Sequence, residues 1–272
     1  MRSKLNILSA FIVFLICISC SDENSEPQSD NSSPESSIQT DKFSQFNWIV
    51  KETKNIADSR YYCLTNKNNV KFEKDGSVVL RLTKNGDNWE GGELTIDTTL
   101  GYGDYIFEIS APEGSINPNA NLSLSIINVE EDIFEGMTQT GVRFSKYSEP
   151  DALNELEYYL YATDKKIAEV QTPDNPFTLT KNTSLHKIGI YPDHLIYTSK
   201  SNNFNNETKI LKQSTVVDPQ PDLLSFSPST NKLKVNISFC FAESNEPLGN
   251  NGLSIRIHSF KYSPAISGLA IK

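Results

Sequence analysis

The sequence predicts an all-β fold, a jelly roll in which two antiparallel sheets pack face to face. Short runs of alternating apolar and polar residues recur along the chain, rich in β-branched and aromatic side chains, as expected of strands with one buried face. Asn, Gly, Asp and Pro bound these runs at intervals of about 10 to 15 residues, which favours a sandwich over a parallel α/β fold. Helical periodicity is almost absent, and only Asp151–Leu156 is compatible with a turn of helix.

The amino end has the pattern of an export signal. Two cationic residues precede an apolar run that extends from Leu5 to Ile18. A run of roughly 14 residues is shorter than the about 20 that a membrane helix needs, so we interpret residues 1–19 as a signal peptide. The segment Leu15–Cys20 resembles a bacterial lipobox, which implies cleavage before Cys20 and acylation of that cysteine. A plain secretory signal is the alternative interpretation.

Residues 20–42 form a second region, poor in apolar side chains. Ile38 is its only large apolar residue, so the region cannot bury enough surface to offset the entropy of ordering, and we expect a flexible tether. Its acidic start, Ser21–Glu23, resembles the signal that sends lipoproteins of Bacteroidota to the outer face of the outer membrane. A multiply acylated cysteine anchors durably where one chain holds only marginally. The expected location is therefore the outer membrane, lipid-anchored and exposed at the cell surface.

Residues 43–264 are expected to form one domain, followed by a short tail at 265–272. Roughly 220 residues suffice for a single large sandwich, and no repeat or second linker divides them. The formal net charge of −9 becomes −11 once Arg2 and Lys4 leave with the signal, because 23 basic residues then face 34 acids. Such a surface repels phosphate backbones, so nucleic acid is excluded as an expected partner.

Five runs have the clearest strand pattern in this domain. Each alternates β-branched, aromatic or other large apolar residues with polar ones. They are Ser77–Thr83, Tyr105–Ser110, Asn121–Ile127, Leu233–Phe239 and Leu253–Phe260.

Several segments, in this order, resemble glycoside hydrolase family 16, whose laminarinase-like members have a concanavalin A-like jelly roll. Individually each match is weak, but together they cover most of the domain. The resemblance implies a scaffold that cleaves polysaccharides by hydrolysis of O-glycosyl bonds. The matching segments are Asn47–Lys51, Asn69–Val70, Asp75–Leu82, Asn88–Leu94, Leu100–Tyr105, Phe144–Pro150, His186–Tyr197 and Ile255–Tyr262.

The catalytic motif of that family is missing. Retaining glycosidases need a nucleophilic carboxylate and an acid/base about 5 to 5.5 Å apart, and the family's E-x-D-x-E strand directs three acids to one face. Aligned on Phe144–Pro150, the three positions are Gln139, Gly141 and Arg143. An amide, a bare backbone and a permanent cation cannot serve as nucleophile, helper and acid/base. The expectation is that catalytic residues are absent.

A rival alignment matches the motif to Glu155–Tyr159 instead. It keeps Glu155 as nucleophile and Glu157 in the middle, but it leaves Tyr159 as acid/base. A phenol with an ordinary pKa near 10 is a poor proton donor for this step. The rival alignment also discards the match of Phe144–Pro150, and it leaves an impaired enzyme.

Four residues are expected to line a sugar-binding cleft, namely Arg143, Tyr147, Glu157 and Tyr159, since such clefts combine aromatic faces with a few orienting polar groups. The first alignment makes Glu155–Tyr161 the next strand, with Glu157 and Tyr159 on one face. Trp89 is a candidate at the rim. The alternative is that Tyr158 and Tyr159 only pack in the sheet and that Arg143 pairs with an acid such as Glu157.

Of the four cysteines, Cys17 leaves with the signal and Cys20 is lipidated. Cys63 and Cys240 remain as a possible disulfide, which would close a loop of about 180 residues, or as buried free thiols. The histidines have no metal-ligand spacing, so neither a metal site nor a cofactor is expected.

Three functions follow from these observations. The favoured hypothesis is a lipid-anchored, non-catalytic surface protein that binds or senses a polysaccharide or oligosaccharide. The second is an endo-acting glycan hydrolase that uses Glu155 and Glu157. The third is a structural or partner-binding module with a closed cleft.

Overall fold

The computed structural model describes one compact unit of the chain, Ile38–Lys272, in part. The described residues are 40–54, 63–128, 139–145, 155–162, 167–171, 177, 179–191, 194–202, 208–217, 232–241 and 246–265. The expected signal peptide and Cys20 lie outside them, in the unit Met1–Ser37. Across the described part of the chain, no helix combines the length and apolar character needed to span a membrane.

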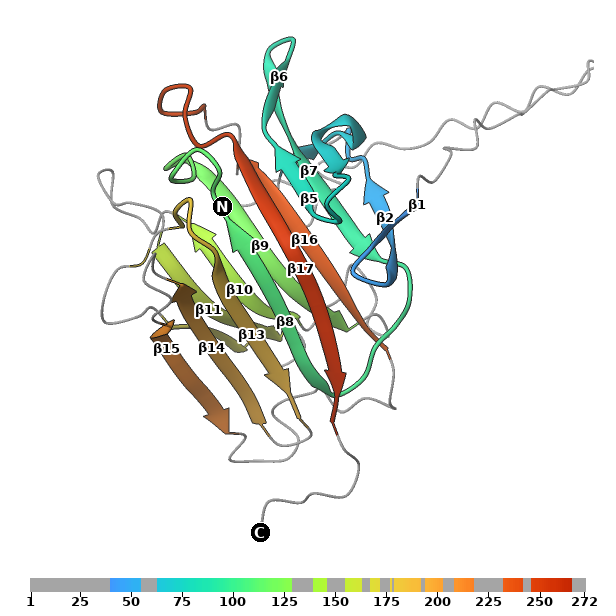
Figure 1. The fold of residues 1–272 in the computed structure, drawn as a ribbon, viewed down its shortest axis with the longest axis vertical. Helices are drawn as coiled ribbons and strands as arrows, with labels where there is room; N and C mark the ends of the chain where they lie inside the picture. Colours follow the sequence, from blue (N-terminus) through green and yellow to red (C-terminus); the bar gives the residue numbers. More distant parts are fainter. Residues whose placement is uncertain are drawn as a thin grey trace, which may run out of the picture. The chain divides into compact units, whose positions relative to one another are not determined.

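The described strands form two sheets (Figure 1). The ten-stranded sheet has the order β1-β2-β7-β16-β9-β10-β11-β12, and β3 and β6 pair with β7 outside this path. Its strands are β1 (Thr40–Phe43), β2 (Phe46–Lys51), β3 (Leu64–Thr65), β6 (Thr83–Asn85), β7 (Asn88–Ile96), β9 (Ala120–Asn128), β10 (Gln139–Ser145), β11 (Glu155–Ala162), β12 (Ile167–Gln171) and β16 (Leu233–Phe241).

The seven-stranded sheet, among the described residues, has the order β15-β14-β13-β8-β17-β5-β4. Its pairs are antiparallel, whereas in the ten-stranded sheet the short β3 runs parallel to β7. Its strands are β4 (Val70–Phe72), β5 (Val78–Arg81), β8 (Gly103–Ser110), β13 (Ser184–Ile190), β14 (His194–Asn202), β15 (Thr208–Val217) and β17 (Ser254–Pro264). A single 3-10 turn, η2 (Lys67–Asn69), completes the described elements.

The all-β sandwich predicted from the sequence is confirmed, and each of the five clearest runs overlaps a strand. One local prediction is wrong. Glu155 and Leu156, which the pattern allowed in a turn of helix, begin strand β11 and pair with Ser145 and Phe144 of β10. Pairing with a neighbouring strand outweighs the weak helical preference of so short a segment.

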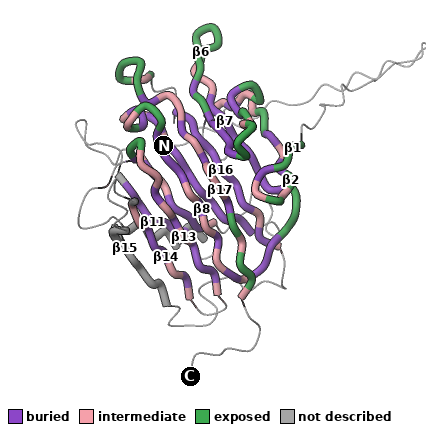
Figure 2. The backbone as a smooth tube through the Cα atoms, in the orientation of Figure 1, coloured by how far each residue is buried: buried purple, intermediate pink, exposed green. Residues whose placement is uncertain are grey.

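The hydrophobic core lies between the two sheets. Alternation along each strand sends every second side chain inward, so Leu122, Leu124 and Ile126 of β9 join the core together with Phe107 of β8 and Phe260 of β17. Exposed residues gather in the loops and at the sheet ends, and the central strands are buried along most of their length (Figure 2).

The other face of the ten-stranded sheet, which we call the outer face, is also buried on its central strands. Along β9 and β16, residues of both faces are buried, among them Ser123 and Ser125 of β9 and Asn236 and Ser238 of β16. Buried polar groups need hydrogen-bond partners, because leaving one unpaired costs free energy. This requirement makes the outer face the place to examine for a functional site.

His186 is a buried titratable group inside the sandwich. It lies on β13, accepts or donates hydrogen bonds with the hydroxyls of Ser184 and Ser199, each at 2.8 Å, and contacts the ring of Phe144 edge-on. Burial disfavours the imidazolium and lowers the pKa of His186 to about 3.

The lowered pKa of His186 predicts that the fold is sensitive to acid. The folded state resists a proton that the unfolded chain accepts below about pH 6.5, so the stabilisation is present above that pH and is lost as the pH falls toward 3. We expect protonation of this residue to lower the free energy of unfolding by about 1 kcal/mol per pH unit in that window. Urea denaturation at pH 7, 6 and 5 measures it, with His186→Gln as the control that flattens the slope. Equal slopes in both proteins would contradict the assignment.

Candidate polysaccharide-binding face

Ten side-chain positions on the outer face form two rows across five neighbouring strands, and we call them the polar ladder. Strand registers place the members of each row side by side, from β7 through β16, β9 and β10 to β11. The first row is Glu93, Ser238, Ser123, Arg143 and Glu157; the second row is Thr95, Asn236, Ser125, Gly141 and Tyr159. Most of these positions are polar although they lie in the interior of a sheet.

Arg143 and Glu157 form an ion pair at one end of the first row. The Nε and Nη2 atoms of Arg143 both donate to Oε2 of Glu157, at 2.7 and 2.6 Å. The Ser145 hydroxyl donates to the same oxygen at 3.0 Å. The Glu157 side chain is fully buried, whereas that of Arg143 is 21% exposed. Charge-assisted bonds of this length are the strong class of hydrogen bond, so the carboxylate is firmly held.

Tyr159 crosses from β11 over Gly141. Its hydroxyl lies 2.8 Å from the Ser123 hydroxyl and 2.6 Å from that of Ser125. The guanidinium carbon of Arg143 lies 5.4 Å from the centre of the Tyr159 ring, within the range of a cation–π contact. A Cβ atom at position 141 would lie 2.7 Å from the Tyr159 hydroxyl oxygen and would also meet the carbonyl oxygen of Leu124. The tyrosine therefore occupies the space above the bare backbone of Gly141.

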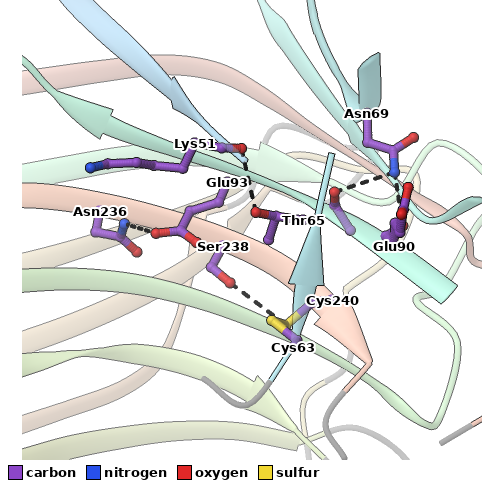
Figure 3. The surroundings of a disulfide bond; sticks show 10 residues. Lys51, Cys63, Thr65, Asn69, Glu90, Glu93, Asn236, Ser238 and Cys240 are labelled. Atoms are coloured by element: carbon purple, nitrogen blue, oxygen red, sulfur yellow. Dashed lines mark hydrogen bonds between the residues drawn. A yellow bond between two sulfur atoms is a disulfide. The ribbon is translucent and has the colours of Figure 1, made fainter. Parts of the chain in front are cut away.

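The opposite end of the ladder has its own network (Figure 3). The Asn236 amide donates to Oε1 of Glu93 at 2.7 Å and to the Thr95 hydroxyl at 2.9 Å. The next outer-face position on β16 is Cys240, which forms a disulfide with Cys63, with their Cα atoms 6.1 Å apart. This bond ties the segment before β3 to the sheet, because the two cysteines are 177 residues apart in sequence.

The other site residues predicted from the sequence lie beside the ladder or outside the described residues. Gln139 is partly exposed on β10 and pairs with Ile127 and Tyr161 of the adjacent strands. Trp89 is partly buried on β7 and packs edge-on against Phe241, at 5.4 Å between ring centres, so it is not part of the ladder. Tyr147 and the side chain of Glu155 lie outside the described residues.

In the structure Tyr158 and Tyr159 pack in the sheet and Arg143 pairs with Glu157, as in the alternative to a sugar-binding cleft. Tyr158 belongs to the core and stacks on Tyr197 at 4.9 Å. Tyr159 is only 2% exposed, so its ring does not offer a stacking surface to solvent in this conformation. Arg143 pairs with Glu157 and is the partly exposed member of that pair.

The ladder lacks a usable pair of catalytic acids. Its two carboxylates, Glu93 and Glu157, lie at opposite ends of the first row. Four strand spacings of about 4.8 Å separate them by about 19 Å. Glycosidases that retain configuration need about 5 to 5.5 Å, and those that invert it need about 6.5 to 9.5 Å. Arg143 stands between them in the row and cannot transfer a proton.

The part of the ladder on β9 and β16 was not predicted from the sequence. Ser123 and Ser125 alternate with leucine and isoleucine on β9, and Asn236 and Ser238 alternate with large apolar residues on β16. That alternation predicted strands with one solvated face, whereas these four polar residues are buried. Two polar pairs in alternation on two expected strands were the available signal, but only the strand register brings them into rows with Gly141 and Arg143.

Comparisons with known proteins agree with this geometry at the level of fold. No family model and no curated protein matches the sequence. A glycoside hydrolase family 16 endo-glucanase from Bacteroides ovatus is similar in structure with a TM-score of 0.58 and 10% identity, over 79% of this chain and 94% of that chain. The chain thus has the fold of the family 16 glycoside hydrolases.

Two further solved structures share the fold. A pseudo β-1,3-glucanase of Mycobacterium tuberculosis is similar with a TM-score of 0.57 and 12% identity, over 80% of this chain and 91% of that chain. Porphyranase B from Zobellia galactanivorans is similar with a TM-score of 0.53 and 11% identity, over 82% of this chain and 87% of that chain. Both an enzyme and a pseudo-enzyme are therefore found on this scaffold.

The fit of Tyr159 over Gly141 predicts the effect of a substitution. Gly141→Ala should lower the free energy of unfolding by about 1–3 kcal/mol, because the new methyl group overpacks against the Tyr159 hydroxyl and the Leu124 carbonyl. Tyr159→Phe removes the hydroxyl and leaves the Tyr159 ring carbon and the Leu124 carbonyl, so the loss in the double variant should be smaller than the sum of the single losses. Urea denaturation of all four proteins measures this coupling, and strict additivity would show that the two residues do not meet.

Proposed function

We propose that this protein is a non-catalytic polysaccharide-binding protein, anchored by a lipid to the outer membrane and exposed at the cell surface. The observation that carries the non-catalytic part is the ion pair of Arg143 with Glu157. A cation stands at the acid/base position of the family alignment, and the carboxylate nearest to it is held by three hydrogen bonds to one oxygen.

The polysaccharide part is supported by the scaffold. The similar structures include an endo-glucanase and a porphyranase, whose names indicate action on polysaccharides, and a pseudo-glucanase. The ladder supplies hydroxyls, one amide and two carboxylates, and neighbouring positions within a row lie about 4.8 Å apart. Groups of these kinds orient sugar hydroxyls in binding sites.

Lipid anchoring is supported by the sequence alone. The apolar run that ends at Cys20 and the acidic residues after it resemble the signals of surface lipoproteins. Residues 20–42 then provide a polar tether between the acylated cysteine and the folded domain.

The binding hypothesis predicts retention without product. The purified domain should be slowed in native gels that contain at least one polysaccharide from a panel of β-glucans, agars, carrageenans and alginates. It should release no reducing sugar from any of them, because Arg143 stands at the acid/base position of the alignment and holds the Glu157 carboxylate. Product release that disappears in Glu157→Gln would establish the hydrolase hypothesis instead. Absence of retention on the whole panel would favour a partner-binding module.

The anchoring hypothesis predicts a change of cell fraction. Cys20→Ser removes the thiol that would be acylated, so the variant should move from the membrane fraction to the soluble fraction, and it should lose incorporation of labelled palmitate. Cys17→Ser is the matched control, because that residue leaves with the signal. If Cys20→Ser remains in the membrane fraction with unchanged labelling, the anchor lies elsewhere.

A further inference from the structure

Three buried acceptor atoms on the outer face have no hydrogen-bond donor in the described part of the structure. They are Asn121 Oδ1, Glu157 Oε1 and Asn236 Oδ1, from strands β9, β11 and β16. Glu157 and Asn236 belong to the polar ladder, and Asn121 lies next to it, paired with Cys240. The side chains of Glu157 and Asn236 are at most 1% exposed.

These three atoms share one chemical property. A carboxylate oxygen and an amide oxygen accept hydrogen bonds and do not donate them. In both ladder residues the partner groups sit on the other atom, since Glu157 is bonded through Oε2 and Asn236 donates through its amide nitrogen. A buried acceptor without a partner destabilises the isolated protein, so a ligand that supplies donors gains the hydrogen bonds that the face lacks.

The charges of the ladder point in the same direction. Arg143 is its one cation, and it is paired with Glu157. Glu93 adds a second carboxylate at the other end of the row. The ladder therefore has a formal charge of −1, from one arginine and two glutamates. An anionic sugar would bring further acceptors and negative charge to a face that has a surplus of both.

We propose that the outer face selects a neutral glycan, whose hydroxyl groups donate to these acceptors, and that it rejects sulfated and uronate glycans. The inference rests on the proposed function, because it names the ligand class of the same site. Arg143, which is 21% exposed, bonds Oε2 of the fully buried Glu157, so a hydroxyl that binds Glu157 Oε1 requires a local rearrangement at this end of the ladder.

Native gels with neutral and anionic polymers test the selection. Laminarin, mixed-linkage β-glucan and agarose are the neutral probes, and carrageenan and alginate are the anionic probes, each at two salt concentrations. We expect a neutral probe to retain the protein at least tenfold more strongly than any anionic probe. Stronger retention on an anionic probe would overturn the selection while the binding function survived. No retention on any probe would overturn both.

A variant at Asn121 tests the acceptors directly. Asn121→Leu keeps a similar size and removes the unpaired oxygen, so it should weaken retention on the neutral probe by roughly tenfold while the melting temperature stays equal or rises. Asn88→Leu makes the same change at an exposed position at the start of β7 and should change neither. If the two variants bind equally well, Asn121 plays no part. A second variant, Glu157→Gln, covers the case in which Asn121→Leu does not fold, and undiminished binding by it would also contradict the proposal.

Discussion

The fit between the Tyr159 hydroxyl and the bare backbone of Gly141 organises the outer face. Because position 141 has no side chain, the phenol lies across β10 and reaches the hydroxyls of Ser123 and Ser125 on β9. The Arg143 guanidinium lies over one face of the Tyr159 ring and forms the ion pair with Glu157. A carboxylate at position 141 would meet the same hydroxyl and the Leu124 carbonyl. The glycine and the tyrosine are thus two parts of one arrangement that is incompatible with three acids on β10.

The ion pair beside this fit sets orientation rather than stability. Removing a carboxylate from water costs several kcal/mol, and a buried pair seldom gains more than it loses. The ion pair fixes direction, because two nitrogens of the guanidinium approach one oxygen of Glu157, and the other oxygen has no donor among the described residues. Lysine could supply the charge at position 143 but not the planar fork that meets both the ring and the carboxylate.

The fold was predictable because apolar and polar residues alternate along each strand, a pattern that depends only on neighbours in sequence. The strand Leu233–Phe241 and its equivalents are visible in the chain for this reason. The site depends on register, which joins Gly141 to Ser125 and Arg143 to Glu157 across strands that the sequence does not align. Alternation also implies a solvated face, and so the burial of Asn236 could not be anticipated. That Gln139, Gly141 and Arg143 carry no carboxylate is read from the sequence itself, and their place in the family motif stays a prediction.

A sheet that served only as a scaffold would have little reason to keep this face polar. Well-packed apolar residues in place of buried polar groups are often neutral or stabilising, and each unpaired acceptor costs about 1–3 kcal/mol. The face nevertheless has serines at two adjoining positions of β9 and an asparagine and a serine at the facing positions of β16. Their presence in continuous rows, together with acceptor oxygens that have no donor among the described residues, fits the proposed binding of sugar hydroxyls.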